Sequence, residues 1–238
     1  MCNKVGRVHV PDGFLDAPTS VATGVLAAGT VALSLRKARE ELDERTAPMA
    51  GLTAAFVFAV QMMNFPVGAG TSGHLIGGAL TAVLVGPWTA VLCMTVVLLV
   101  QALLFADGGL TALGTNVTLM GLVAVGVGYG LFRLVAAVLP RTRTGVLTAA
   151  GVGAAVSVPA AALAFVLLFA LGGVADVPVG SVAATMTGIH VLIGLGEAVI
   201  TVVVLGAVLA VRPDLVRGAA HLRTGADLAP RREPVAGR

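Results

Sequence analysis

Charged residues are scarce in this sequence. Asp, Glu, Lys and Arg make up 11% of its 238 residues, whereas they make up about a quarter of a typical soluble domain. Hydrophobic residues make up 57%, and the mean hydropathy is +0.98. A chain of this composition could not hide its apolar surface in water, so the composition predicts a single membrane domain and no separate soluble one.

Signatures of several other protein classes are missing as well. The two cysteines, Cys2 and Cys93, make no disulfide framework, and no Gly-x-x-x-x-Gly-Lys-Ser/Thr sequence for binding ATP occurs. The net charge is +3, but the basic residues lie in loops and a tail rather than in a stripe, which argues against nucleic-acid binding. Any energy from ATP must therefore come through another protein.

The apolar runs predict an all-α, polytopic membrane protein with about seven transmembrane helices. One helix over 74–106 would reach about 50 Å, whereas the hydrocarbon core of a bilayer is about 30 Å thick. Gly86-Pro87-Trp88 is the expected break, because proline cannot continue the helical hydrogen bonds. The predicted helices are 17–38, 48–64, 74–86, 88–106, 111–138, 145–172 and 182–211.

The positive charges predict the orientation of these helices. With the N-terminus outside, all of the 15 Lys and Arg residues except Lys4 and Arg7 fall in inner loops and the tail, as the positive-inside rule expects. Residues 8–211 would then form the membrane-embedded domain, and residues 212–238 a basic cytoplasmic tail. The expected location is the cell membrane of a prokaryote, crossed several times.

Two histidines suggest a metal site inside the membrane. His74 is the second-last residue of the Gly-rich polar stretch 61–75, QMMNFPVGAGTSGHL, and His9 lies in the stretch 8–15, VHVPDGFL. The helix 74–86 would span only about 20 Å, so it is expected to begin below the membrane surface at His74, with Thr71 and Ser72 as capping residues. Alternatively, His74 is a capping or packing residue and His9 an exposed terminal one.

Other polar residues fall within the predicted spans, where they are expensive and often functional. Glu197 lies seven residues after His190 on the last helix, so the two share a face. Such a pair could orient a metal ligand or form a structural ion pair. The remaining polar residues are Gln101, Asn116 and the pair Gln61 and Asn64, which share a helix face. The simplest interpretation is that they form hydrogen bonds between helices.

Four stretches together resemble the CbiM/NikM family, the substrate-binding membrane components of energy-coupling factor transporters for cobalt or nickel. They read FAVQMMNFP at 58–66, GTSGHL at 70–75, VQALLFADGG at 100–109 and GIHVLIGLGEA at 188–198. The resemblance runs from about residue 8 to residue 211. It implies a metal held by the terminal amine at Val8, by the backbone nitrogen and imidazole of His9, and by His74.

This ligand set suits particular metals. An amine, an amide nitrogen and an imidazole on adjacent residues form fused chelate rings, and four nitrogens in a plane suit Ni²⁺, Cu²⁺ and low-spin Co²⁺. The ligands must be deprotonated. Residues expected to lie around the ligands are Asn64, Thr71, Ser72, His190 and Glu197.

The sequence departs from the family pattern at its start, because residues 1–7 precede Val8. The family pattern begins with Met-His, and valine codons include GTG, an alternative bacterial start codon that is translated as methionine. We therefore expect residues 1–7 to be a mis-annotated extension and Val8 to be the true initiator. The rival hypotheses are proteolytic trimming and a site that uses two imidazoles with other donors.

The resemblance implies a function in metal uptake without a permanently bound cofactor. The partners would be a transmembrane coupling protein, two cytoplasmic ATPase subunits and, in some systems, a small accessory membrane protein. Cobalt for cobalamin biosynthesis is the first candidate, because nickel proteins of the family often carry a fused C-terminal membrane segment; nickel is the alternative. The sequence around the histidines and Glu197 has no nucleophile or open metal motif, which argues against a membrane enzyme. The predicted spans are too apolar for the continuous polar pore of a channel.

Overall fold

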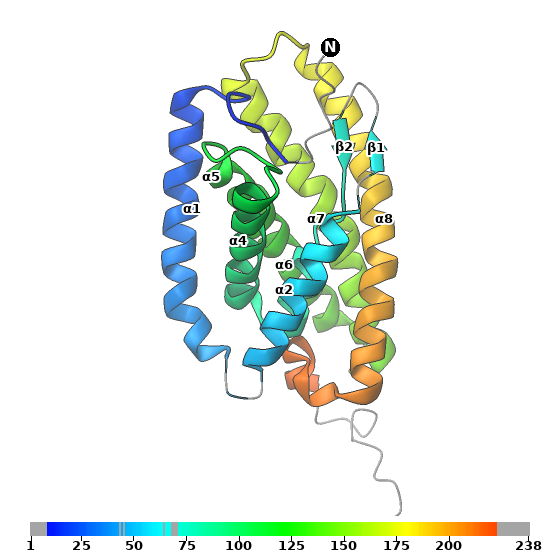
Figure 1. Cartoon of the computed structure of the whole chain (residues 1–238). Coiled ribbons are helices and arrows are strands. Elements are labelled where there is room, and N and C mark those ends of the chain that lie inside the picture. The colour runs from blue at the N-terminus through cyan, green and yellow to red at the C-terminus, as the bar shows by residue number, and fades with distance from the viewer. Residues whose placement is uncertain (1–8, 43, 45, 64, 68–70, 223–238) are drawn as a thin grey trace, which may run out of the picture.

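The computed structural model describes residues 9–222 except 43, 45, 64 and 68–70, and this part of the chain is a bundle of helices (Figure 1). Five helical stretches are long and apolar enough to cross a membrane. The helical elements are α1 (Ala17–Lys37), η1 (Ala38–Glu40), α2 (Ala47–Gln61), α3 (Gly78–Val85), α4 (Pro87–Leu104), α5 (Leu113–Asn116), the π-helix η2 (Val117–Ala124), α6 (Val125–Val138), α7 (Arg143–Gly172), α8 (Val179–Val211), η3 (Pro213–Leu215) and η4 (Arg217–Leu222).

The predicted all-α membrane architecture is confirmed, with two corrections in the stretch 62–77. Helix α2 ends at Gln61 rather than at residue 64, and α3 begins at Gly78 rather than at residue 74. Between them the strands β1 (Phe65–Val67) and β2 (Thr71–Gly73) pair as an antiparallel hairpin, with Phe65 opposite Gly73. The glycines and Pro66 of this stretch disfavour a helix, so the polar loop folds back on itself instead of extending the helices on either side.

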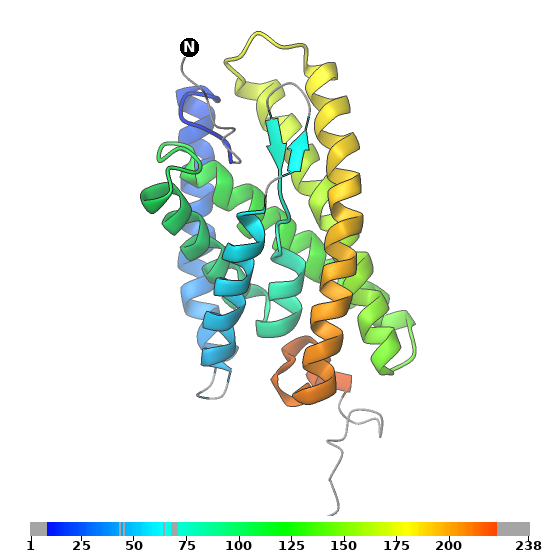
Figure 2. The same ribbon diagram turned by 45° about the vertical axis from the view of Figure 1, so that its right-hand side comes forward.

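The short helix α3 lies at the centre of the bundle. All eight of its residues are buried, and it contacts α2, α4, α6, α7 and α8. Figure 2 shows α3 beneath the hairpin, flanked by longer helices. At 1.5 Å per residue it is about 12 Å long, so it cannot cross a bilayer alone and depends on its neighbours for support.

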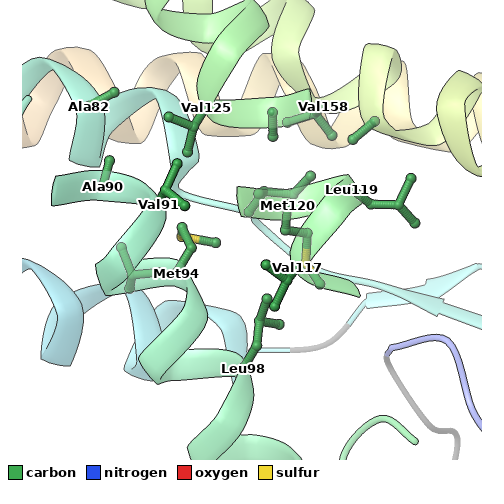
Figure 3. Packing of buried hydrophobic residues seen from close by; sticks show 14 of the residues in the cluster. Ala82, Ala90, Val91, Met94, Leu98, Val117, Leu119, Met120, Val125 and Val158 are labelled. Atoms are coloured by element: carbon green, nitrogen blue, oxygen red, sulfur yellow. The ribbon is translucent and has the colours of Figure 1, made fainter. Parts of the chain in front are cut away.

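Large apolar side chains fill the contact between α3, α4, η2, α6 and α7. Figure 3 shows this cluster, in which Met94 of α4 and Met120 of η2 lie near each other. Other large apolar side chains are exposed on the outer faces of the long helices, as with Leu163 and Leu167 of α7, which lie one turn apart. An apolar exterior of this kind is favourable against lipid tails, so the burial pattern agrees with the membrane interpretation.

The predicted break between α3 and α4 is confirmed and depends on glycine. Gly86 has φ 99°, a left-handed conformation, and a Cβ atom there would lie 2.5 Å from the carboxyl carbon of Glu41. The Glu41 carboxylate accepts hydrogen bonds from the backbone N–H groups of Trp88 (3.3 Å) and Thr89 (2.7 Å) at the start of α4. Arg217 of η4 donates to the Glu41 carbonyl (2.7 Å). The end of the bundle opposite the hairpin is therefore tied together by Glu41.

Candidate metal site

The segment that precedes α1 enters the bundle and is held there by hydrogen bonds. The Asn116 side chain accepts from the Val10 N–H (3.1 Å) and donates to the Val10 carbonyl (3.2 Å), so it pairs with Val10 as a neighbouring strand would. The Gly109 N–H donates to the same carbonyl (3.0 Å). Two residues further on, Asp12 Oδ1 accepts from the Thr111 N–H (2.8 Å) and from the Thr111 hydroxyl (2.6 Å). Gly109 and Thr111 belong to the loop between α4 and α5, and Asn116 is the last residue of α5.

The same segment is also anchored to the end of α7. The Phe14 ring packs on Phe165 and Phe169, with ring centroids 5.7 and 5.5 Å away. The Asp16 N–H donates to the Gly172 carbonyl (2.7 Å), while the Asp16 carboxylate caps α1. Figure 1 shows this segment in dark blue, descending beside α5 from the end of the bundle that carries the hairpin. Residues 9–16 are thus held between the α4–α5 loop and the end of α7, with His9 and Leu15 buried and Asp12 and Gly13 exposed.

These anchors bring His9 against His74. The ring centroids are 4.6 Å apart with an interplanar angle of 60°, and the two residues are only 5% and 7% exposed. His74 follows directly on β2, so the hairpin carries it into the bundle. The two histidines that the sequence singled out, one at the start of the chain and one in the Gly-rich stretch, are therefore brought together, and the interpretation of His9 as an exposed residue is wrong.

Each of the two imidazole rings keeps a ring nitrogen with a free lone pair. His74 Nδ1 lies 2.8 Å from the Leu75 carbonyl oxygen. A carbonyl only accepts, so Nδ1 carries the proton and Nε2 keeps its lone pair. Neither ring nitrogen of His9 makes a hydrogen bond, although both are buried. His9 Nδ1 lies 3.4 Å from the Asp107 carboxylate, which is a charge contact too long for a good hydrogen bond.

The loop that carries Asp107 approaches His9 closely because Gly108 has no side chain. Gly108 has φ 92°, and a Cβ atom there would lie 3.0 Å from His9 Cβ and 3.2 Å from Asn116 Nδ2. Only glycine combines this backbone conformation with this approach. Buried ring nitrogens without partners are costly unless a ligand uses them, so the arrangement of the two imidazoles is chemically suited to a transition-metal ion.

The other residues expected near the site have mixed outcomes. Val8 and Asn64 lie outside the described residues. The prediction that Thr71 and Ser72 cap the helix is wrong, because they form part of β2 and the N-cap of α3 is Gly77. Their expected place around the metal stays a prediction.

His190 and Glu197 have separate hydrogen-bond partners and do not contact each other. His190 Nδ1 lies 2.7 Å from the Met186 carbonyl oxygen, one turn earlier on α8. The Glu197 carboxylate accepts instead from the backbone N–H groups of Ile76 (2.7 Å) and Gly77 (3.0 Å). Glu197 therefore supports the segment that follows His74 rather than His190.

Sequence reasoning assigned some of the supporting residues a different role. Asn116 was expected to bond between helices, but it binds the backbone of Val10, and Gln101 makes no side-chain hydrogen bond although it is fully buried. Asp107 and Gly108 carried a signal only through the FADGG stretch at 105–109. Among the described residues, no group of three His, Cys, Asp or Glu side chains could hold a metal.

Helices long and apolar enough to cross a membrane surround two buried imidazoles that contact each other, which is the arrangement of a membrane protein with a candidate transition-metal site. The chain belongs to the CbiM family, because the family model for the cobalt uptake substrate-specific transmembrane region matches residues 9–215. It is thus a component of a cobalt or nickel transporter and a multi-pass membrane protein of the cell, not an enzyme.

Several relatives are similar over most of the chain. A putative metal transport protein of Haloquadratum walsbyi is 39% identical over 88% of this chain and 93% of its own length. A cobalt transport protein of Sorangium cellulosum is 38% identical over 87% of this chain and 94% of its own length. A putative fused nickel transport protein of Archaeoglobus fulgidus is 35% identical over 88% of this chain and 68% of its own length. Relatives named for cobalt and for nickel both match this chain over nearly nine-tenths of its length, at 38% and 35% identity.

Solved structures share the fold. The crystal structure of a transition metal transporter matches with a TM-score of 0.79 and 30% sequence identity, covering 91% of this chain and 100% of that one. A truncated transition metal transporter matches with a TM-score of 0.77 and 31% identity, covering 85% and 98% of the two chains. The arrangement of helices is thus that of known metal transporters.

Proposed function

We propose that this protein is the substrate-capture membrane component of an energy-coupling factor importer, and that its first substrate is Co²⁺ for cobalamin biosynthesis. Ni²⁺ is the alternative substrate. The observation that carries the proposal is the contact between the His9 and His74 rings, whose centroids are 4.6 Å apart. Asn116 holds the segment that carries His9 in place. The comparisons support a transport role, and the donor chemistry supports either ion.

The proposed ligands are the imidazole and backbone nitrogen of His9, the imidazole of His74 and a terminal amine at residue 8. An amine at that position would result from translation that starts at Val8, as a GTG codon would allow, or from proteolytic removal of residues 1–7. In support, the family model begins its match at residue 9. In a chelate with its own backbone nitrogen, His9 would use Nδ1, because only that atom closes a six-membered ring. Nδ1 is the nitrogen that faces Asp107, so metal capture would replace this contact.

Transport would need partners, because this chain has no ATP-binding signature of its own. The proposed partners are a transmembrane coupling protein and two cytoplasmic ATPase subunits, with a small accessory membrane protein as a further possibility. The proposed orientation, with the N-terminus outside, would expose the segment 9–16 and the hairpin to the side from which the ion is captured. The end of the bundle tied by Glu41 would then face the partners in the cytoplasm.

The first experiment measures the intact mass and metal content of the protein expressed from its native gene. We expect a chain that begins with methionine at position 8 and carries about one Co²⁺ or Ni²⁺. Two engineered forms, one starting at position 8 and one retaining residues 1–7, are then titrated with each ion. A retained extension with undiminished affinity would contradict the terminal-amine ligand, and the ligands would have to be sought among His9, His74, His190 and Glu197.

The histidine ligands are tested by His74→Ala and His190→Ala in the form that binds metal. Loss of binding in His74→Ala but not in His190→Ala is expected, because only His74 contacts His9. The coupling partners are tested by copurification with the native gene cluster and by ATP-dependent uptake of labelled Co²⁺ and Ni²⁺. Uptake that continues without ATP would contradict the importer and favour a channel.

A further inference from the structure

The segment that joins His74 to α3 has no regular secondary structure but is entirely buried. Residues 74–77 are all buried in the bundle, so their backbone N–H and C=O groups cannot be left to water. The groups of Ile76 are satisfied by side chains from two other helices. Glu197 of α8 accepts from the Ile76 N–H (2.7 Å), and Gln61 at the end of α2 donates to the Ile76 carbonyl (2.7 Å).

Both supporting side chains are themselves fully enclosed. Glu197 is 2% exposed and Gln61 is 0% exposed. The second Glu197 oxygen accepts from the Gly77 N–H (3.0 Å), which places the carboxylate at the N-terminus of α3, where the helix dipole favours a negative charge. Among the described residues Glu197 makes no ion pair. Its carboxylate therefore uses one oxygen on each of two backbone donors, which a neutral amide side chain could not reproduce.

The bond between Leu75 and Ile76 links Glu197 to His74. His74 Nδ1–H donates to the Leu75 carbonyl (2.8 Å), and Glu197 accepts from the Ile76 N–H. This carbonyl and this N–H belong to one peptide group, which is planar and rigid. The imidazole, the peptide group and the carboxylate thus form a continuous chain of hydrogen bonds, in which each bond polarises the next.

We propose that Glu197 is a positioning residue that acts on His74 through the Leu75–Ile76 peptide group, and that Gln61 holds the same segment from the opposite side. The carboxylate makes the Leu75 carbonyl a better acceptor, which fixes the proton on His74 Nδ1 and leaves Nε2 free and more basic toward the metal. Carboxylates that contact a ligating histidine directly have this effect in other metal sites. Here a peptide group stands between them. The inference rests on the proposed function, because it concerns how His74 is prepared as a ligand.

The test compares Glu197→Gln with Thr201→Val in the metal-binding form of the full chain. Thr201 is the matched control, because it is buried one turn further along α8 and its hydroxyl has no hydrogen-bond partner. We expect Glu197→Gln to weaken Ni²⁺ and Co²⁺ affinity by about 10- to 100-fold and to shift the visible absorption of the bound Ni²⁺. Thr201→Val should change neither. Equal losses in the two variants would overturn the proposal.

A second readout does not need metal. In metal-free protein labelled with ¹⁵N-histidine, the His74 signal should show Nδ1 protonated in the native chain and a mixture of tautomers in Glu197→Gln. An unchanged tautomer would overturn the proposal even if affinity fell. Gln61→Leu serves as a second variant if Glu197→Gln does not fold. We expect it to lose affinity for Ni²⁺ and Co²⁺, and native affinity would contradict the role of Gln61.

These outcomes separate the inference from the function on which it rests. Absence of metal binding in the native chain, or full binding by His74→Ala, would contradict the proposed function. Native binding that depends on His74 but is unaffected by both Glu197→Gln and Gln61→Leu would contradict only the inference.

Discussion

Replacing Asn116 with alanine is expected to release the N-terminal segment from the bundle. The Asn116 amide satisfies both backbone groups of Val10, directly after His9. A net hydrogen bond contributes about 1 kcal/mol, so losing both costs about 2 kcal/mol. This corresponds to a roughly 30-fold shift in the equilibrium between the seated and the released segment. The Val10 carbonyl keeps its bond from Gly109, whereas the Val10 N–H loses its only described partner.

Amide hydrogen exchange over residues 9–15 measures this equilibrium directly. We expect exchange there to be faster in Asn116→Ala by up to about 30-fold, with no change in the core helix α3. Metal affinity should fall by the same factor or less, because the apparent affinity scales with the fraction of protein whose segment is seated. Asn116→Asp keeps an acceptor for the Val10 N–H and loses the donor, so its effect should be about fivefold. Native exchange in Asn116→Ala would refute the role of Asn116 as the anchor.

Three further predictions concern other contacts of the structure. Gly108→Ala should weaken metal binding, since its methyl group would collide with His9, whereas Gly126→Ala, whose methyl group meets no neighbour, should bind normally in the same titration; equal binding would contradict this packing. Asp12→Ala should speed exchange of residues 9–15 by about fivefold or more, because the Thr111 N–H and hydroxyl lose their Oδ1 acceptor. Hydrogen bonds from Thr111 hold the pKa of Asp12 below its ordinary value of 3.8. The contribution of Asp12 to holding the segment 9–15 in the bundle is therefore present above about that pH and is lost as pH falls through the lowered pKa. Native exchange in the variant down to pH 5 would contradict this contribution. Glu41→Ala should cost about 1–3 kcal/mol of stability, because two backbone N–H groups of α4 lose their acceptor; thermal unfolding in detergent measures this loss. A matching loss of metal affinity would contradict the expectation that Glu41 acts only at the end of the bundle opposite the hairpin.

The sequence was sufficient to predict the helices and the break between α3 and α4, because apolar runs and a Gly-Pro pair carry those features locally. It also singled out His9 and His74, although their contact depended on the resemblance to a known family. The hairpin was missed, because strands of three residues leave no periodic pattern.

The supporting contacts were not predictable from local sequence. Asn116 bonds a residue 106 positions away, and Glu197 bonds residues 120 and 121 positions away. Asn, Gln and Glu in an apolar helix indicate that a partner exists, but not which one. Glu197 was paired with His190 on the basis of helical spacing alone, whereas the structure places its carboxylate against the backbone of another segment.

The distance along the chain between Ile76 and Glu197 also constrains when the metal site can form during biosynthesis. Helix α3 is eight residues long, too short to be inserted into the bilayer as an independent span. The amides at its start have no acceptor until α8, the last long helix to be synthesised, has entered the membrane. A nascent chain that lacks α8 therefore carries both histidines without the support that orients His74. Under the proposed function, metal capture would therefore follow the insertion of α8 into the membrane.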